Sequence, residues 1–193
     1  MTLVFATHND HKVLELRQLL PPQIKLYSLT DIGCHEEIPE TGNTLEANAK
    51  IKADFVKYKY GLDCFADDSG LEIEVLGGAP GVHSARYAGE QKDNEANINK
   101  VWQKLIGKSN SEACFKTLIF AHIHNQSYSF EGRVDGNIIR ERKGEGGFGY
   151  DPIFVPKGYD KTFAELGESI KNQISHRAKA TASLLSTLQH MIQ

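Results

Sequence analysis

Residues 64–75 read CFADDSGLEIEV, and the two adjacent carboxylates in this stretch decide how it is interpreted. Asp67 and Asp68 follow a short apolar run, and apolar residues alternate again after Ser69-Gly70, which predicts a strand, a turn and a second strand. A buried carboxylate without a partner costs several kcal/mol, so these acids must meet water, a cation or a metal ion. Because Asp, Ser and Gly are common turn residues, an ordinary solvated turn remains the alternative.

The length and composition of the chain favour one soluble domain. Its 193 residues suit a single domain that could form two lobes, and its apolar runs are shorter than the roughly 18 residues of a membrane span. The first residues lack the features of a signal peptide, so we expect a cytoplasmic protein. The net charge of −3 argues against a nucleic-acid-binding protein. The widely spaced Cys34, Cys64 and Cys114 predict buried, reduced thiols.

Helical and strand-like segments alternate in the first half of the chain, and strand-like segments follow one another later. The expected strands are 3–6, 24–29, the two strands around Asp67-Asp68, the hairpin of 115–123 and 128–134, and 138–142. The expected helices are one that ends before Pro21, one from Thr44 to Tyr60 that stops at Gly61, one at 93–106 and one from about Ser175. This order predicts an α/β protein with a mixed sheet, in which ligands tend to bind at strand ends.

A polar segment, Thr7-His8-Asn9-Asp10-His11-Lys12, joins the first expected strand to a helix. Backbone N–H groups at a helix start favour an anion such as phosphate. Lys12 could add positive charge, and Thr7 or Asn9 could form hydrogen bonds. The segment lacks the glycines and the Gly-Lys-Ser/Thr ending of a Walker loop, so a capped helix start remains the alternative.

Acidic residues outside the Asp67-Asp68 pair suggest a magnesium site. Glu40 lies in a loop with Glu36 and Glu37, of which the last two are more typical of solvated surface acids. Glu40 and the two aspartates offer the oxygen ligands that Mg2+ prefers.

A different metal site could involve His122 and His124, which lie two apart on an expected strand. The sequence offers them no apparent third His or Cys ligand. We therefore favour the carboxylates.

The segment Gly146-Gly147-Phe148-Gly149-Tyr150-Asp151 combines glycines with two aromatic residues. Glycine allows close backbone approach, and the two rings could stack on a planar base. Lys171 and Ser175-His176-Arg177 add donors near a helix start, where Arg177 suits a ligand or a carboxylate better than a capping role. Lys52 on the long helix is equally consistent with a solvated lysine.

Together these segments resemble the inosine triphosphate pyrophosphatase family, which hydrolyses non-standard purine nucleoside triphosphates. The matching segments, in the family's order, are Thr7-x-Asn9-x-x-Lys12, Glu40-Thr41-Gly42, Asn48-Ala49-x-x-Lys52-Ala53, Ala66-Asp67-Asp68-Ser69-Gly70-Leu71, Gly77-Gly78-Ala79-Pro80-Gly81-x-x-Ser84-Ala85-Arg86, Gly146 to Pro152, and Ser175-His176-Arg177. Two positions depart from the family pattern: His8 stands where many relatives have glycine, and Ala47 where they often have glutamate.

The resemblance implies an α/β fold with an elongated mixed sheet and flanking helices that form two lobes around a central cleft, in a homodimer. It implies magnesium-dependent hydrolysis of ITP, dITP or XTP between the α- and β-phosphates, which yields the monophosphate and pyrophosphate. A pyrophosphatase of similar architecture acting on other modified nucleotides, or a nucleotide-binding dimer without catalysis, remains an alternative.

The resemblance also assigns roles to individual residues. Asp68 would be the catalytic carboxylate and, with Glu40, a magnesium ligand. The expected substrate-binding residues are Thr7, His8, Asn9, Asp10, His11, Lys12, Lys52, Ser69, Phe148, Gly149, Tyr150, Asp151, Lys171, His176 and Arg177.

Overall fold

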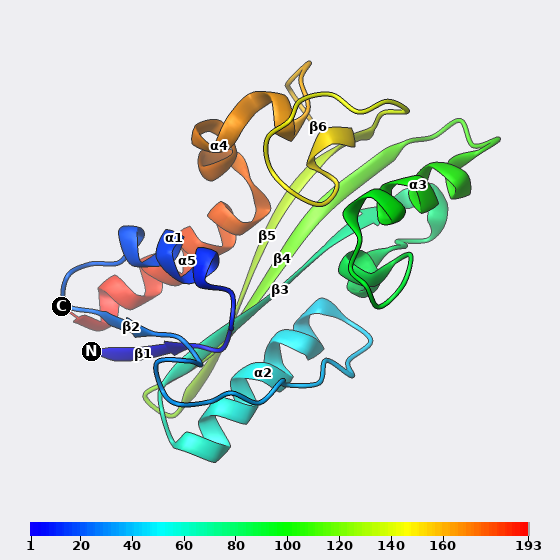
Figure 1. The fold of residues 1–193 in the computed structure, drawn as a ribbon. Coiled ribbons are helices and arrows are strands. Elements are labelled where there is room, and N and C mark those ends of the chain that lie inside the picture. Colours follow the sequence, from blue (N-terminus) through cyan, green and yellow to red (C-terminus); the bar gives the residue numbers. More distant parts are fainter. Residues whose placement is uncertain (193) are drawn as a thin grey trace. The chain divides into compact units, whose positions relative to one another are not determined.

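A computed structural model describes residues 1–192, and for His11, Glu15, Gln18 and Ile192 it describes the backbone alone. In this part of the chain, six strands form one sheet in the order β2-β1-β3-β4-β5-β6 (Figure 1). The strands are β1 Thr2–Phe5, β2 Lys25–Tyr27, β3 Cys64–Ile73, β4 Glu112–Ile123, β5 Gln126–Ile138 and β6 Phe154–Pro156. The helices are α1 Asp10–Leu19, α2 Leu45–Tyr60, α3 Asn94–Leu105, α4 Phe163–Ile174 and α5 His176–Ile192, with 3-10 turns η1 Glu74–Leu76, η2 Gly81–Arg86 and η3 Asp151–Ile153. The predicted α/β fold with a mixed sheet and flanking helices is confirmed.

The chain forms two compact units, each assembled from separate segments. Unit 1 comprises residues 1–68, 118–130 and those from 181 onward, and unit 2 comprises residues 69–117 and 131–180. In unit 1, β1 pairs in parallel with both β2 and β3. In unit 2, β5 pairs antiparallel with β6. The sheet therefore contains both kinds of pairing.

Helix α2 is the central helix of unit 1. Thr44 caps it by accepting a hydrogen bond from Ala47 N at 3.0 Å, and Gly61 ends it in the left-handed conformation with φ 69°. Its small residues Ala49 and Ala53 are fully buried among side chains of β1 and β3. Figure 1 shows α2 on one side of these strands and α1 on the other. Close packing of these small side chains fixes the position of the helix.

Strand β3 is continuous from Cys64 to Ile73, so the predicted turn at Ser69-Gly70 is wrong. The acids in the middle of the strand have protein partners, because Asp67 meets Lys12 and Asp68 meets Asn48. These contacts satisfy the carboxylates without a solvated turn. Local turn propensity is therefore overruled by tertiary contacts.

The predicted hairpin is confirmed, and its two strands are longer than expected. His124 and Asn125 connect β4 to β5 with φ values of 48° and 62°, which is the conformation of a two-residue type I′ turn. The third strand expected at 138–142 is wrong, because Ile138 is the last residue of β5.

Unit 2 contains a helix that the sequence analysis misses. Helix α4 begins after Thr162, whose side chain accepts from Glu165 N while the Glu165 side chain accepts from Thr162 N. This reciprocal pair is a capping box, and the Thr-x-x-Glu pattern is visible in the sequence. The core of this unit includes a group of aromatic side chains, with the rings of Phe115 and Phe154 4.7 Å apart and Phe163 packed on Phe154.

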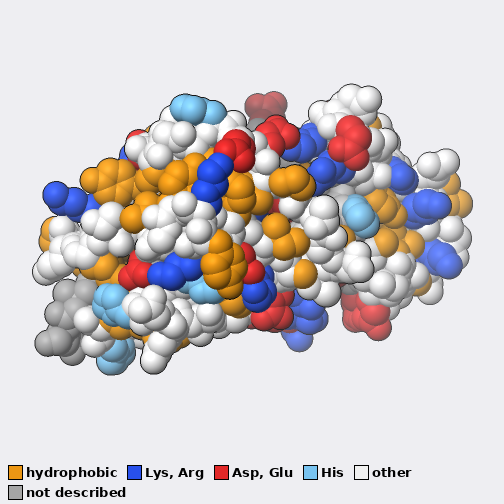
Figure 2. Space-filling model, turned by 90° about the horizontal axis from the view of Figure 1, so that it is seen from below, with side chains coloured by type: hydrophobic (Ala, Val, Ile, Leu, Met, Phe, Trp, Pro, Cys, Tyr) orange, Lys and Arg blue, Asp and Glu red, His pale blue; other side chains and the backbone are white. Residues whose placement is uncertain are grey.

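The three cysteines are free and buried, as predicted. Burial raises the pKa of the Cys64 thiol to about 12. The described helices include none with the length and apolar character needed to cross a bilayer. Figure 2 shows that acidic and basic side chains both occur across the face in view, among hydrophobic and uncharged ones.

Candidate active site

The loop between β1 and α1 is held by its own polar groups. Asn9 N donates to Thr7 Oγ1 at 3.1 Å, and Asn9 Oδ1 caps the helix by accepting from Lys12 N at 3.2 Å. Asp10 adds a negative charge to the first turn, and the His11 side chain lies outside what the structure describes. The loop is thus a capped helix start, and its position at an exposed helix N-terminus also suits an anion.

His8 connects this loop to the acidic loop that carries Glu40. Its Nε2 lies 3.0 Å from the carbonyl oxygen of Glu36, and because a carbonyl can only accept, the imidazole N–H donates. The His8 imidazole therefore contacts protein backbone.

Lys12 and Asp67 form the most buried ion pair of unit 1. Lys12 Nζ lies 2.8 Å from each carboxylate oxygen of Asp67, whose side chain is only 4% exposed. A carboxylate this buried requires a cation, and the lysine supplies it. The expectation that Asp67 meets water, a cation or a metal ion is therefore confirmed, and its partner is the ammonium group of Lys12.

Lys52 lies among three carboxylates. Its Nζ donates to Glu40 Oε1 at 2.5 Å and to the backbone oxygen of Asp67 at 2.7 Å. Burial alone would lower the pKa of this lysine, but the charges of Asp67, Glu40 and Asp68 outweigh that effect and raise the pKa. Lys52 is therefore a fully charged, largely buried member of the site and not a solvated lysine.

Asp68 is held by Asn48, which belongs to the segment Asn48-Ala49-x-x-Lys52-Ala53 but has no predicted role. Asn48 Nδ2 donates to Asp68 Oδ2 at 3.1 Å, and Asn48 Oδ1 accepts from Gly42 N at 2.8 Å. A signal was available, because Asn48 is a polar residue beside Ala49 on the apolar stripe of α2. We call Glu40, Asp67 and Asp68, with Lys12 and Lys52, the carboxylate cluster.

The carboxylate cluster has the donor chemistry of a magnesium site. The described residues contain no group of three or more His, Cys, Asp or Glu side chains arranged to hold a metal ion. Mg2+, however, commonly takes only one or two carboxylates together with water and substrate phosphates. Asp68 and Glu40 are partly exposed and suit that requirement, whereas both oxygens of Asp67 bond to Lys12.

The alternative metal site at His122 and His124 does not fit the geometry. His122 Nε2 lies 2.7 Å from Asp54 Oδ1, and its Nδ1 lies 3.0 Å from Ser127 Oγ. Backbone N of His124 donates to Asp63 Oδ2 at 3.0 Å. Both ring nitrogens of His122 are thus engaged by protein groups, which is typical of a structural histidine.

In unit 2, the glycine-rich segment forms a tight turn closed by Asp151. The buried Asp151 carboxylate accepts from Phe148 N at 2.8 Å and also pairs with Lys171. A Cβ on Gly147 would lie 2.2 Å from Asp151 Oδ2, and Gly149 has φ 61°, so both positions require glycine. The turn leaves the Phe148 ring 61% exposed.

Two cations of unit 2 lie near the Phe148 ring. Lys171 Nζ is 4.3 Å from the ring centroid, and Arg177 Cζ is 5.9 Å from it. The ring of the buried His176 stacks on Phe115 at 4.8 Å between centroids. We call Phe148, Asp151, Lys171, His176 and Arg177 the aromatic cluster.

Tyr150 and Ser69 have structural contacts within unit 2. Tyr150 is only 4% exposed, and its hydroxyl donates to Ser84 O at 2.8 Å. Burial raises the pKa of this tyrosine. Because the side chain is buried, the expectation that its ring is available for stacking is wrong. Ser69 Oγ lies 2.7 Å from Thr117 Oγ1.

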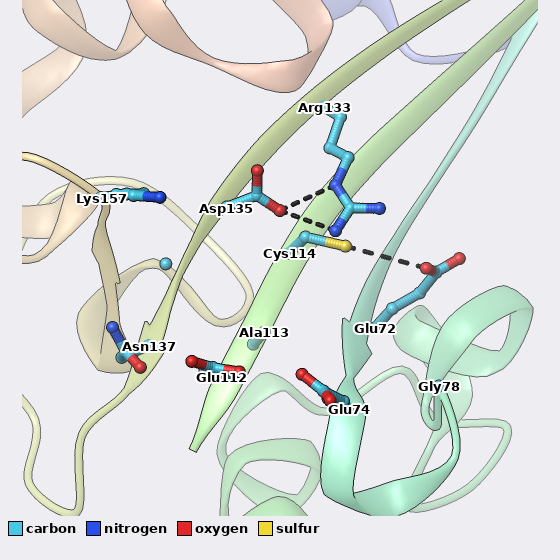
Figure 3. Close-up of a pocket in the computed structure, with 11 residues that line it drawn as sticks. Glu72, Glu74, Gly78, Glu112, Ala113, Cys114, Arg133, Asp135, Asn137 and Lys157 are labelled. Atoms are coloured by element: carbon cyan, nitrogen blue, oxygen red, sulfur yellow. Dashed lines mark hydrogen bonds and ion pairs between the residues drawn. The ribbon is translucent and has the colours of Figure 1, made fainter. Parts of the chain in front are cut away.

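Unit 2 also contains a pocket of about 460 Å³ (Figure 3). Its acidic lining residues are Glu72, Glu74, Glu112 and Asp135. Figure 3 shows Asp135 paired with Arg133, and Glu72 also pairs with Lys116 at 2.8 Å. The residues that line this pocket include none of the predicted site residues.

Known proteins are similar to this chain over nearly its whole length. The Ham1 family model matches residues 3–187. A dITP/XTP pyrophosphatase of Flavobacterium psychrophilum is 55% identical over 185 residues, which cover 96% of this chain and 97% of that protein. A dITP/XTP pyrophosphatase of Bacillus subtilis is 49% identical over 190 residues, with 96% of each chain covered.

Solved structures agree with this assignment. The Ham1 protein of Staphylococcus aureus has a TM-score of 0.94 at 37% identity, covering 99% of this chain and 100% of that one. A nucleoside-triphosphatase / dITP/XTP pyrophosphatase of Mycobacterium abscessus has a TM-score of 0.83 at 41% identity, covering 96% and 99%. The resemblance to the inosine triphosphate pyrophosphatases is thereby confirmed, and the chain belongs to the Ham1 family.

Proposed function

We propose that this protein hydrolyses dITP, XTP and ITP to the nucleoside monophosphate and pyrophosphate, and so removes non-standard purines from the nucleotide pool. Relatives that carry the name dITP/XTP pyrophosphatase, at 49% to 55% identity over nearly the whole chain, support this proposal. The observation that carries it is the carboxylate cluster, in which a partly exposed Asp68 lies beside two partly buried lysine–carboxylate pairs.

Different residues of the carboxylate cluster would bind the metal, bind the phosphates and accept the proton of the attacking water. When bound at Asp68 and Glu40, Mg2+ would supply positive charge to the triphosphate and lower the pKa of a water ligand. Lys12 and the N-terminus of α1 would bind phosphate oxygens and take up the charge that develops on the leaving pyrophosphate. Asp68 would orient the attacking water and accept its proton.

The aromatic cluster suits the purine base. Hypoxanthine and xanthine carry an oxygen acceptor at the 6-position, where adenine carries an amino donor. Arg177 and Lys171 are donors near the exposed Phe148 ring, on which a base could stack. ATP would set donor against donor, and unmatched polar groups in such a site disfavour the wrong base.

A direct assay tests the proposed reaction. The purified protein is incubated with dITP, XTP, ITP and ATP in magnesium buffer, and pyrophosphate, orthophosphate and nucleoside monophosphate are quantified. We expect pyrophosphate and monophosphate in equal amounts from dITP, XTP and ITP, and much less from ATP. Release of orthophosphate without pyrophosphate, or absence of turnover, would contradict the proposal.

The metal requirement is tested by exchange. We expect activity to disappear in excess chelator and to return with Mg2+, and we expect Ca2+ to substitute poorly because its longer, looser coordination misplaces the reacting groups. Full activity in excess chelator would exclude the metal from the reaction.

We also propose a cytoplasmic homodimer, which rests on the family resemblance. Sedimentation equilibrium at micromolar concentration should give twice the chain mass of 21.5 kDa. A monomer under those conditions would overturn this part of the proposal.

A further inference from the structure

Asn48 joins two parts of the carboxylate cluster through one side chain. It is 3% exposed and is the fourth residue of α2. Its amide oxygen accepts from Gly42 N, in the loop of Glu40, and its amide nitrogen donates to Asp68 Oδ2. The partners fix the orientation of the amide, because a backbone N–H needs an acceptor and a carboxylate needs a donor.

The close approach of the Glu40 loop to Asn48 requires a glycine. A Cβ on Gly42 would lie 2.8 Å from Asn48 Oδ1 and 2.7 Å from the Cβ of Ala47. The Glu-Thr-Gly sequence therefore ends in glycine because the first turn of α2 occupies the space of a side chain. The loop bearing Glu40 and the strand bearing Asp68 both take their position from the same amide group.

We propose that Asn48 is a positioning residue for the reaction: it holds Oδ2 of Asp68 and thereby sets the orientation of the catalytic carboxylate relative to Glu40. This inference rests on the proposed function. Asparagine suits the role because it offers one acceptor and one donor at fixed spacing, and a hydrogen bond to a charged group is stronger than a neutral one. Residues that orient ligating carboxylates typically change activity by about 10- to 100-fold when altered.

The chain contains a matched control in Asn97. This residue is also buried and also fourth in its helix, α3, where its Oδ1 accepts from Ala88 N at 2.6 Å. Its Nδ2 donates to a neutral backbone oxygen, Ala85 O, at 3.0 Å, where that of Asn48 meets a carboxylate. The two asparagines therefore have the same structural role in a helix start, but only Asn48 contacts Asp68.

The test compares Asn48→Asp with Asn97→Asp at saturating magnesium. Each substitution keeps the size and the acceptor oxygen, removes the amide donor and adds a negative charge, which in Asn48→Asp faces Asp68. For Asn48→Asp, we expect kcat on dITP per folded molecule to fall about 10- to 100-fold while KM changes by no more than about threefold. For Asn97→Asp, we expect a similar loss of thermal stability and an unchanged kcat per folded molecule.

A double variant and a second position keep the inference falsifiable if Asn48→Asp folds poorly. Combining Asn48→Asp with Asp68→Asn restores an amide–carboxylate pair, so we expect stability to recover while activity stays lost. Gly42→Ala leaves Asn48 in place and pushes the loop away from it, so it should lower kcat in the same way. Amide hydrogen exchange at Gly42 should be slow in the wild type and in Asn48→Asp, and fast in Asn48→Ala.

The outcomes separate this inference from the proposed function. If the wild type releases pyrophosphate and Asn48→Asp keeps its kcat per folded molecule, the positioning role is wrong and the proposed function stands. If Asn97→Asp loses kcat to the same extent, the effect is structural and the inference is again wrong. If the wild type shows no hydrolysis of any tested triphosphate, the proposed function fails and the inference fails with it.

Discussion

The carboxylate cluster of unit 1 and the aromatic cluster of unit 2 both contain lysine–carboxylate pairs, but they use them differently. In unit 1, Lys12 and Lys52 pair with Asp67 and Glu40, and these charged groups are the ones that the proposed function assigns to the triphosphate and the metal. In unit 2, the Lys171–Asp151 pair closes a glycine turn that presents an aromatic ring. Substitutions in the carboxylate cluster should change the charge that acts on the phosphates and the metal. Substitutions in the aromatic cluster should change the contact area and the hydrogen bonds available to the base.

The largest effect should come from Asp68→Asn, which removes charge from unit 1 and keeps its size. A metal ion and its water contribute several kcal/mol, so we expect kcat to fall on the order of 10³-fold or more. Nucleotide binding should remain measurable by equilibrium titration. A variant with near-native pyrophosphate release would remove Asp68 from the catalytic role.

The next effect concerns stability. Lys12→Met leaves the buried Asp67 carboxylate without its lysine, which should lower the free energy of unfolding by about 3 kcal/mol. The matched control is Lys50→Met, because the Lys50–Asp54 pair is more exposed and should contribute at most about 1 kcal/mol. Urea unfolding of both variants without nucleotide measures the difference. Equal losses would mean that burial does not distinguish the two pairs.

In unit 2, Phe148→Ala and Arg177→Ala should separate contact area from hydrogen bonding. Loss of stacking on Phe148 should weaken the binding of ITP and ATP alike, by roughly 1 to 3 kcal/mol of binding free energy. KM should therefore rise for both substrates. Loss of Arg177 should lower the activity on ITP more than the activity on ATP. The ratio of ITP activity to ATP activity should therefore fall by about tenfold. Steady-state kinetics with both substrates gives the two ratios. An unchanged ITP-to-ATP ratio in Arg177→Ala would exclude this residue from base recognition.

The smallest effect should appear in the pH dependence of stability. Because the surrounding carboxylates raise the pKa of Lys52 in the folded state, its charge stabilises the fold below the ordinary value of 10.5, and this contribution is lost as pH rises through the folded-state pKa. The stability difference between the wild type and Lys52→Met should therefore be constant at about pH 7 to 9 and shrink above about pH 10.5. Urea unfolding of both proteins across this pH range measures the stability difference. A difference that grows with pH would contradict a raised pKa of Lys52.

The elements with strong local signals are the ones that the sequence predicts well. Helix α2 ends at Gly61 as predicted, and Thr44, the predicted start of the helix, is its N-terminal cap. The turn predicted at Ser69-Gly70 fails because the partner of Asp67 is Lys12, 55 positions earlier, and a local pattern cannot show such a contact. Tyr150 is misassigned for the same reason, since its hydroxyl partner is the distant Ser84.

The candidate site could be predicted by residue type but not by pairing. Motif order identifies Glu40, Lys52 and Asp68, yet the sequence does not reveal that Lys52 bonds to Glu40. Asn48 stands in one of the matching segments but receives no role there, because asparagine carries no charge and does not titrate. Its importance follows from two distances that depend on the packing of α2 against β3.

Unit 1 is assembled from three separate segments of the chain, which affects when it can fold during synthesis. The last residue of unit 2 is Ala180, whereas unit 1 also needs the part of α5 from Thr181 onward, where Leu184 and Leu188 are fully buried. Domains made on the ribosome generally fold from the N-terminus first. Here the unit that contains the first strand cannot complete its core until α5 has been synthesised. Unit 1 is therefore completed late in translation, although all five residues of its carboxylate cluster lie within the first 68 positions.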